Sequence, residues 1–450
     1  MTWQADGTAL RIARTIAGWA RSGEEVEAFV ARGTDSQILV RNQNVESFTS
    51  AESGGVGVRV RTGSRIGFAH TNQLDKASLE TALTDARNNA RHTQPSDSAV
   101  LPHPDGVPAG SLDLWREEAG RYAVQNKVSL ACELERLATG SPGVSGVKSV
   151  SWGDAAGESS IVSSTGIESY SRRTSCFLSG YFIGTSNAGR PATSTAYTTG
   201  RCPADLDLSA AVHQAADSLA RQSSTRRTTL PSQRMPVILS PPATAAFLVV
   251  ISDMLNSPDQ MLVSPEAGNS LIAAQSVTLM DDPTDPTCFG AARFDAEGLA
   301  TRRNLLIDRG RTAGRLHDAA SGRRAGMPSN GAAMRAGYKS LPRPAPRALA
   351  LTPGDLDPVA ALAEVGHGFL VENISGLPAG TDPLTGHFSA AVGGHVVRGG
   401  ELTEYVPHTT LASTVPLLLH GVQRVGTDST PLPGIAKGTT VLVSGLAVGG

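Results

Sequence analysis

The chain has 450 residues, of which 40% are hydrophobic, 18% charged and 4% aromatic, and its formal net charge is −2. This length exceeds the roughly 100–200 residues of one typical domain, so we expect two or three domains with sizeable cores. Ordinary apolar content and small net charge exclude global disorder. A near-neutral chain without a basic stripe also disfavours nucleic acid as a main partner.

The four cysteines are widely separated and form no CxxC pair, which argues against zinc-ribbon and thioredoxin-like sites. They are Cys132, Cys176, Cys202 and Cys288. Scattered thiols fit a reducing compartment, and the N-terminus lacks the basic and apolar regions of a signal peptide. Since no apolar run approaches about 18–20 residues, we expect a cytoplasmic protein without a membrane partner.

The first half alternates between helical and strand patterns. Leu10, Ala13 and Ala17 share one face of a predicted helix that Ser22-Gly23 ends. Strands are predicted at 25–31, 37–40, 55–60 and 65–69, and Asp75 is the predicted N-cap of the next helix. Further along we expect a loop at 95–110, a helix-rich segment at 111–138, strands from 144 to 197 and a helix at 204–221.

The second half begins after a polar segment without periodicity, residues 222–234, which marks a domain boundary. A strand at 236–240, a buried helix at 243–255 and mostly strands with glycine-rich turns follow. An extended connector is predicted at 342–346, and Asp357-Pro358 indicates a helix that runs to about 366. We therefore predict an α+β fold, with a mixed helix and antiparallel-sheet domain at 1–225 and a strand-rich domain at 226–450.

Searches for catalytic motifs identify no active site. The chain has no GxGxxG after a strand, no GxxxxGK[ST] and no HExxH, and no two histidines stand at the i, i+4 spacing of a helical zinc site. Glu364 and His367 come nearest, but a histidine in the last turn of a helix is better explained by its favourable dipole contact. Adjacent His317 and Asp318 would face opposite ways on a strand, so they are interpreted as structural.

Carboxylates gather near the start of the second domain, in the segments DDP at 281–283 and RFDAEG at 293–298. Paired carboxylates can act as acid and base or bind a hard cation. Asp before Pro, and Asp or Glu before Gly, are also common turn formers, and we favour that interpretation.

Nine segments in chain order together resemble the TldD/PmbA family, and within it the PmbA (TldE) branch. In the first domain they are GVGVRVRTGSRIGFAHTN at 55–72 and KVSLACELERL at 127–137. In the second they are DDP, RFDAEG, NLLIDRG at 304–310, GHGFLVENISG at 366–376, DPLTGHFS at 382–389, residues 399–412 and the glycine-rich 445–450.

The resemblance implies a two-subunit zinc metallopeptidase, in which a TldD-type subunit carries HExxxH on a helix and the PmbA-type subunit lacks it. The corresponding helix here has Val249, Val250 and Met254 at about the ligand and base positions, and no cysteine follows at 430–450. None of these side chains can bind zinc as an imidazole or move a proton. We therefore assign this chain no catalytic, cofactor-binding or metal-binding residue of its own, and expect zinc in the partner.

Three functions follow as hypotheses. The favoured one is a TldE-like, non-metal subunit that helps a HExxxH-bearing partner process short or unfolded peptides, including leader removal in peptide natural-product maturation. A stand-alone hydrolase could instead use Asp281, Asp282, Asp295 or Glu297 with a nearby histidine. A non-enzymatic binding or modulator protein is the third. If this subunit handles substrate, His367, His387 and the DDP segment are the candidates.

Overall fold

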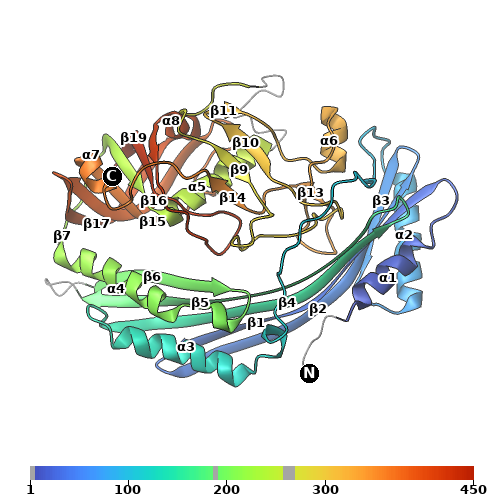
Figure 1. Cartoon of the computed structure of the whole chain (residues 1–450), viewed down its shortest axis with the longest axis horizontal. Helices are drawn as coiled ribbons and strands as arrows, with labels where there is room; N and C mark the ends of the chain where they lie inside the picture. The colour runs from blue at the N-terminus through green and yellow to red at the C-terminus, as the bar shows by residue number, and fades with distance from the viewer. Residues whose placement is uncertain (1–5, 186–190, 257–268) are drawn as a thin grey trace.

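The computed structural model describes residues 6–185, 191–256 and 269–450. A long curved sheet carries helices on its outer side, and the second half of the chain lies against its inner side (Figure 1). Helices and mainly antiparallel sheets are combined in both halves, so the predicted α+β class is confirmed.

The curved sheet is antiparallel, with the strand order β3-β2-β1-β4-β5-β6. Its strands are β1 (Glu24–Arg41), β2 (Asn44–Thr62), β3 (Arg65–Thr71), β4 (Gly146–Ser163), β5 (Glu168–Thr185) and β6 (Pro191–Gly200). Asn42 and Gln43 join β1 to β2 with φ values of 51° and 60°. A two-residue turn in this left-handed region matches the twist of a hairpin, which fixes the register of these long strands.

The segments 25–31 and 37–40, predicted as separate strands, form the single strand β1. Gly33, between them, faces Ser53 of β2 and Gly157 of β4, so the ladder continues on both sides. The predicted strand at 55–60 is likewise only the end of β2. The preceding residues 44–53 are polar or exposed on both faces and therefore show no apolar alternation.

Four helices cover the outer face of the curved sheet: α1 (Thr8–Ala17), α2 (Lys76–His92), α3 (Val124–Thr139) and α4 (Leu208–Ser224). Val26 and Val58 are buried under α1 and α2, while Trp152 and Leu178 are buried under α3 and α4. Asp75 caps α2 as predicted, accepting a hydrogen bond from the Ser78 N–H at 3.0 Å. Local period and capping therefore place α2 correctly, whereas α1 ends at Ala17 and not at Ser22-Gly23 as predicted.

Two boundaries differ from prediction. In the segment 111–138, only α3 and a short 3-10 turn at Ala119–Arg121 are helical. Gln222, predicted to begin the linker, lies in the last turn of α4, where its buried amide donates to the Thr193 carbonyl at 2.9 Å. The chain then enters β7 (Arg226–Arg227), which pairs with the second half's main sheet. The division into 1–225 and 226–450 stays a prediction.

The second half is strand-rich, and its main sheet has the order β18-β19-β8-β15-β16-β17-β7. Besides β7, its strands are β8 (Gln233–Leu239), β15 (His367–Ser375), β16 (His387–Arg398), β17 (Glu401–Thr414), β18 (Val422–Val425) and β19 (Val441–Val448). A smaller sheet, β11-β10-β9-β14, consists of β9 (Leu279–Asp281), β10 (Asn304–Asp308), β11 (Arg311–Thr312) and β14 (Leu349–Leu351). β12 (Ala333–Met334) pairs with β13 (Arg343–Pro344) inside the predicted connector.

Helices in the second half are α5 (Pro241–Asn256), α6 (Ala319–Ala325), α7 (Ala361–Val365) and α8 (Val415–His420). α7 is shorter than predicted, because the Asp357 carboxylate forms a turn with the Val359 N–H at 2.9 Å before the helix starts. Over the described residues, the chain has no helix both long and apolar enough to cross a bilayer.

Candidate functional site

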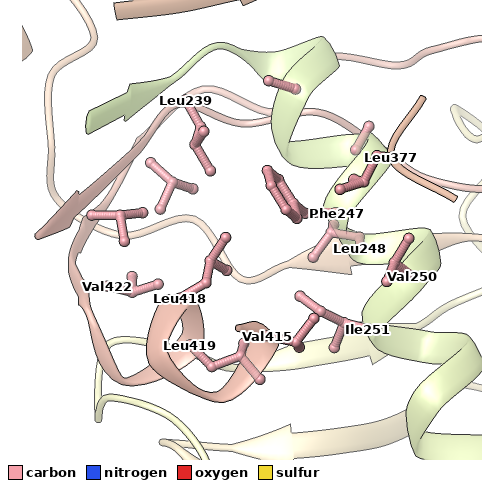
Figure 2. Packing of buried hydrophobic residues seen from close by; sticks show 14 of the residues in the cluster. Leu239, Phe247, Leu248, Val250, Ile251, Leu377, Val415, Leu418, Leu419 and Val422 are labelled. Atoms are coloured by element: carbon pink, nitrogen blue, oxygen red, sulfur yellow. The ribbon is translucent and has the colours of Figure 1, made fainter. Parts of the chain in front are cut away.

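Helix α5 carries the positions at which the family resemblance places a metal motif. Val250 and Met254 are 6% and 3% exposed, and half-buried Val249 packs against the same hydrophobic core. Figure 2 shows Val250 and Ile251 of α5 within the buried cluster that α8 completes. These positions therefore serve as packing.

The same core tolerates little change of volume. The Phe247 ring of α5 meets Phe388 of β16 edge-on, with centroids 5.0 Å apart. The Met254 methyl lies so close to Gly386 that a Cβ added there would approach it to 3.1 Å. The side chains of α5 and β16 therefore interdigitate in this core.

A zinc ion needs about four nitrogen, sulfur or oxygen ligands in tetrahedral arrangement. Val249, Val250 and Met254 offer none that suits zinc. Within residues 6–185, 191–256 and 269–450, no group of three or more histidine, cysteine, aspartate or glutamate side chains is arranged to hold a metal. The residues of α5 do not fit the metal that the family implies.

The candidate histidines do not come together. His367 and His387 are exposed residues that open β15 and β16, at opposite ends of the hairpin formed by these strands. The Glu364 carboxylate pairs with Arg424 at 2.9 Å. His317 approaches the Ser321 hydroxyl at 3.5 Å.

One buried histidine was not singled out by its sequence context. His395 Nδ1 lies 3.3 Å from a Glu372 carboxylate oxygen, and Arg221 of α4 reaches the same carboxylate at 3.0 Å. Burial raises the pKa of Glu372, but the His395 and Arg221 contacts outweigh burial and leave that pKa below its usual value. Since Arg221 comes from the first half, this cluster ties α4 to β15.

Asp281 and Asp295 of the second domain both accept backbone N–H groups. Asp281 accepts the backbone N–H groups of Arg347 and Ala348 at 2.8 and 2.6 Å. Asp295 accepts those of Glu297 and Leu299 at 2.8 and 3.0 Å, and also that of Ala333. The Glu297 and Leu299 contacts of Asp295 are those of a turn-forming carboxylate, as predicted for RFDAEG. Asp281 instead lies in β9 and binds backbone groups 66 and 67 positions away, so the turn interpretation does not describe its contacts.

Asp282 and Asp318 also act locally. Asp282 accepts the Thr284 N–H at 3.1 Å and pairs with Arg303 at 2.9 Å. Asp318 is the N-cap of α6, where it accepts the Ser321 N–H at 2.7 Å. Neither carboxylate is paired with a histidine in the part of the chain that the structure describes.

Glu297 belongs to a buried ion network that joins the two halves. Arg59 of β2 donates to Glu27 of β1 at 2.8 Å and to Glu297 at 2.9 Å, and Arg335 also pairs with Glu27. All four side chains are almost fully buried. Burial, together with neighbouring carboxylates, raises the pKa of Glu297 to about 7 despite Arg59. Glu297 thus links the second half to β2 through Arg59.

The inner face of the curved sheet forms a groove with a floor of small residues. Gly33, Gly157 and Ser159 line a cavity of about 450 Å³, which Tyr338 of the second half bounds on one side. A Cβ on Gly33 would approach the Ala156 carbonyl to 2.7 Å, so the backbones come close at this point. An extended segment can approach such a floor without meeting large side chains.

One edge of the curved sheet is open. β3 pairs only with residues 56–62 of β2, so residues 44–55 pair with β1 alone among the described strands. Val45 and Phe48 are 44% and 47% exposed on this edge. A long exposed edge with apolar side chains is a ready surface for strand pairing.

Three models of one family match most of the chain. The PmbA/TldA metallopeptidase C-terminal domain matches residues 232–450, domain 1 of that family matches 26–90, and its central domain matches 118–226. The chain belongs to the PmbA/TldD metallopeptidase family. The resemblance that the sequence segments indicated is thus confirmed, and the structure can be compared with relatives along its whole length.

Metalloprotease PmbA of Escherichia coli O157:H7 is 23% identical over 445 residues, which are 98% of this chain and 94% of that protein. A Haemophilus influenzae PmbA homologue is 24% identical over 436 residues, 94% of this chain and 92% of that protein.

Solved structures share the fold. TldE from Thermococcus kodakarensis superimposes with a TM-score of 0.84 at 18% identity, covering 98% of this chain and 99% of that one. A Thermotoga maritima protein, described as a candidate modulator of a DNA gyrase, gives 0.87 at 21% identity, covering 97% and 99%.

Proposed function

We propose that this chain is the non-metal, TldE-like subunit of a heteromeric zinc metallopeptidase, paired with a TldD-type subunit that carries HExxxH. Membership of the metallopeptidase family supports the peptidase setting. The observation that carries the proposal is the burial of Val250 and Met254 of α5 in a hydrophobic core. A helix packed in this way stabilises the subunit and leaves metal chemistry to the partner.

The role of this chain would be to confine the peptide. The groove on the inner face of the curved sheet has a volume of about 450 Å³ and is lined by Gly33 and Gly157, which suits an extended backbone better than a folded domain. We therefore propose short or unfolded peptides as substrates, including leader segments removed during natural-product maturation. The proposed place of action is the cytoplasm, since the scattered thiols fit a reducing compartment.

The open edge of β2 supports assembly with a partner. Its unpaired backbone groups and exposed Phe48 would be an aggregation hazard in an isolated protein. Pairing with the TldD-type subunit would satisfy these backbone groups.

The test compares the purified chain, the TldD-type subunit and the co-expressed pair in one peptidase assay. The proposal expects a stable pair that cleaves unfolded peptides, while this chain alone is inert. Substituting the HExxxH glutamate of the partner should abolish the activity without dissolving the pair. Met254→Leu in this chain should preserve it, because a packing position accepts a volume-conserving change.

Two other outcomes would replace the proposal. Chelator-resistant cleavage by the lone chain would favour the stand-alone hydrolase. A stable pair without any peptidase activity would favour a modulator, the role named for the Thermotoga maritima protein.

A further inference from the structure

A second cavity, of about 210 Å³, lies where the inner face of the curved sheet meets the loops of the second half. Its charged lining is strongly biased towards cations, with five arginines and one carboxylate, Asp295. The arginines are Arg172, Arg173, Arg293, Arg335 and Arg347. The chain as a whole is nearly neutral, so this is a local concentration of positive charge.

Three of these arginines have evident structural partners. Arg335 pairs with Glu27 in the buried network. Arg172 lies over the Trp115 ring at 5.3 Å from its centroid, and Arg293 donates to the Gly110 carbonyl at 3.0 Å. These contacts account for the positions of Arg172 and Arg293. Arg335 Nη1 is buried without a hydrogen-bond partner among the described residues, but the charge of Arg335 is paired with Glu27.

Arg173 of β5 is different. Its guanidinium donates to the Phe289 carbonyl at 2.7 Å, and no carboxylate of the described residues forms an ion pair with it. Burial, followed by repulsion from Arg201 and Arg347, lowers the pKa of Arg173 to about 10. The neighbouring charges thus oppose the charge on Arg173.

Arg347 is also undersatisfied. Its Nε is buried and has no hydrogen-bond partner within the described ranges. Asp295 and Asp281 attract it from beyond ion-pair distance, but burial outweighs them and lowers its pKa. Both carboxylates already accept backbone N–H groups. An enclosed guanidinium with free donors favours an anion that can accept them.

We propose that Arg173 and Arg347 form an anion-binding subsite that takes a carboxylate group of a peptide. The planar guanidinium matches a carboxylate through two parallel hydrogen bonds. The choice of a peptide as ligand rests on the proposed function, whereas the preference for an anion follows from the cavity itself.

The size of this cavity and its connection to the groove fit the end of a peptide or one of its side chains. The cavity is smaller than the roughly 300 Å³ at which pockets for drug-sized ligands begin, so it can enclose about one residue. Ser159, Ser171 and Arg173 line both this cavity and the larger groove. A segment lying in the groove can therefore place a terminal or side-chain carboxylate between the two arginines.

Calorimetry on the full chain, without a partner, tests the subsite with three probes: N-acetylglycine, N-acetylglycinamide and N-acetylaspartate amide. The first carries a terminal carboxylate, the second none, and the third a side-chain carboxylate only. We expect one or both acids to bind and the neutral amide not to bind. The stronger acid identifies which carboxylate the subsite takes.

The variants are Arg173→Gln and Arg347→Gln, with exposed Arg323→Gln of α6 as the charge-matched control. Each cavity variant should weaken acid binding at least about tenfold, and the control should bind as the wild type does. Without ligand, Arg173→Gln should melt at or above the wild-type temperature, because it removes an opposed, enclosed charge. If one variant does not fold, the other variant and the binding of the probes to the wild type still test the subsite.

Equal binding of acid and amide, no binding of any probe, or acid binding unchanged in both variants would overturn the subsite. Inorganic phosphate is titrated as a further competitor, and tighter binding of phosphate than of either acid would overturn the carboxylate assignment. If the pair with the TldD-type subunit is active but this chain binds no acid, the subsite is rejected and the proposed function stands. If the pair is inactive but this chain clearly binds the acid, the proposed function is rejected and the subsite stands.

Discussion

Arg59→Met tests the bridge between the two halves most severely. Methionine keeps much of the arginine's length but removes the hydrogen bonds to Glu27 and Glu297. Glu27 retains Arg335, while Glu297 retains, among the described residues, only the Ala319 N–H at 2.8 Å. Breaking a buried pair in this way leaves an uncompensated carboxylate and should cost about 3–5 kcal/mol of unfolding free energy.

The penalty should depend on pH, because of Glu297. Its pKa is raised from 4.5 to about 7 in the fold, so its protonation stabilises the folded state most below about pH 4.5, and that contribution is lost as the pH rises through 7. Without Arg59, Glu297 loses the main attraction that lowers its pKa, so this pKa should rise further. We therefore expect Arg59→Met to cost more at about pH 8, where wild-type Glu297 is ionised and attracted by Arg59, than at about pH 5.5, where it is already protonated.

Urea unfolding followed by circular dichroism at both pH values measures the cost. The control is Arg14→Met, which removes a bidentate ion pair between Arg14 and Glu168. These two side chains are 55% and 48% exposed. Solvent already screens that pair, so a much smaller change is expected, with little pH dependence. A penalty for Arg59→Met that matched the control at both pH values would refute the account of the network.

Other consequences are simpler to check. Met254→Ala should cost about 2–5 kcal/mol in chemical unfolding because it opens a cavity beside α8, whereas 70%-exposed Leu384→Ala should stay within about 0.5 kcal/mol; similar costs would contradict the packing of α5. Phe48→Lys should weaken assembly with the TldD-type subunit, measured by calorimetry, while leaving the lone chain's stability unchanged; undiminished assembly would reject the β2 edge as the interface. At about pH 8 a thiol reagent should modify Cys132 before unfolding, and not Cys288, since burial raises the pKa of Cys288 to about 12; early loss of the Cys288 thiol would contradict its burial.

Local patterns predicted the helices well and the long strands poorly. The cap at Asp75 and the apolar surface of residues 243–255 are properties of neighbouring residues, so α2 and α5 could be placed from the sequence. β1 could not, because Gly33 and its polar neighbours are held in the strand by β2 and β4. Ladders between distant segments outweigh local preference there.

The buried charged groups between the two halves could not be predicted from the sequence for the same reason. Glu297 was considered as a turn residue or an acid, yet it is bound to Arg59, more than two hundred positions away. Nothing in a single sequence links Arg173 with Arg347 either. Only one pattern in the sequence pointed to this inner face. Polar and glycine residues at alternating positions of β1 form the face of the sheet that meets the second half.

Zinc stoichiometry tests the central claim most directly. The lone chain, purified after expression with zinc in the medium, should contain substoichiometric zinc, while the co-purified pair should contain zinc that is lost when the partner's HExxxH histidines are substituted. That result would agree with an α5 whose Val249, Val250 and Met254 serve only as packing. Stoichiometric zinc in the lone chain would contradict this account.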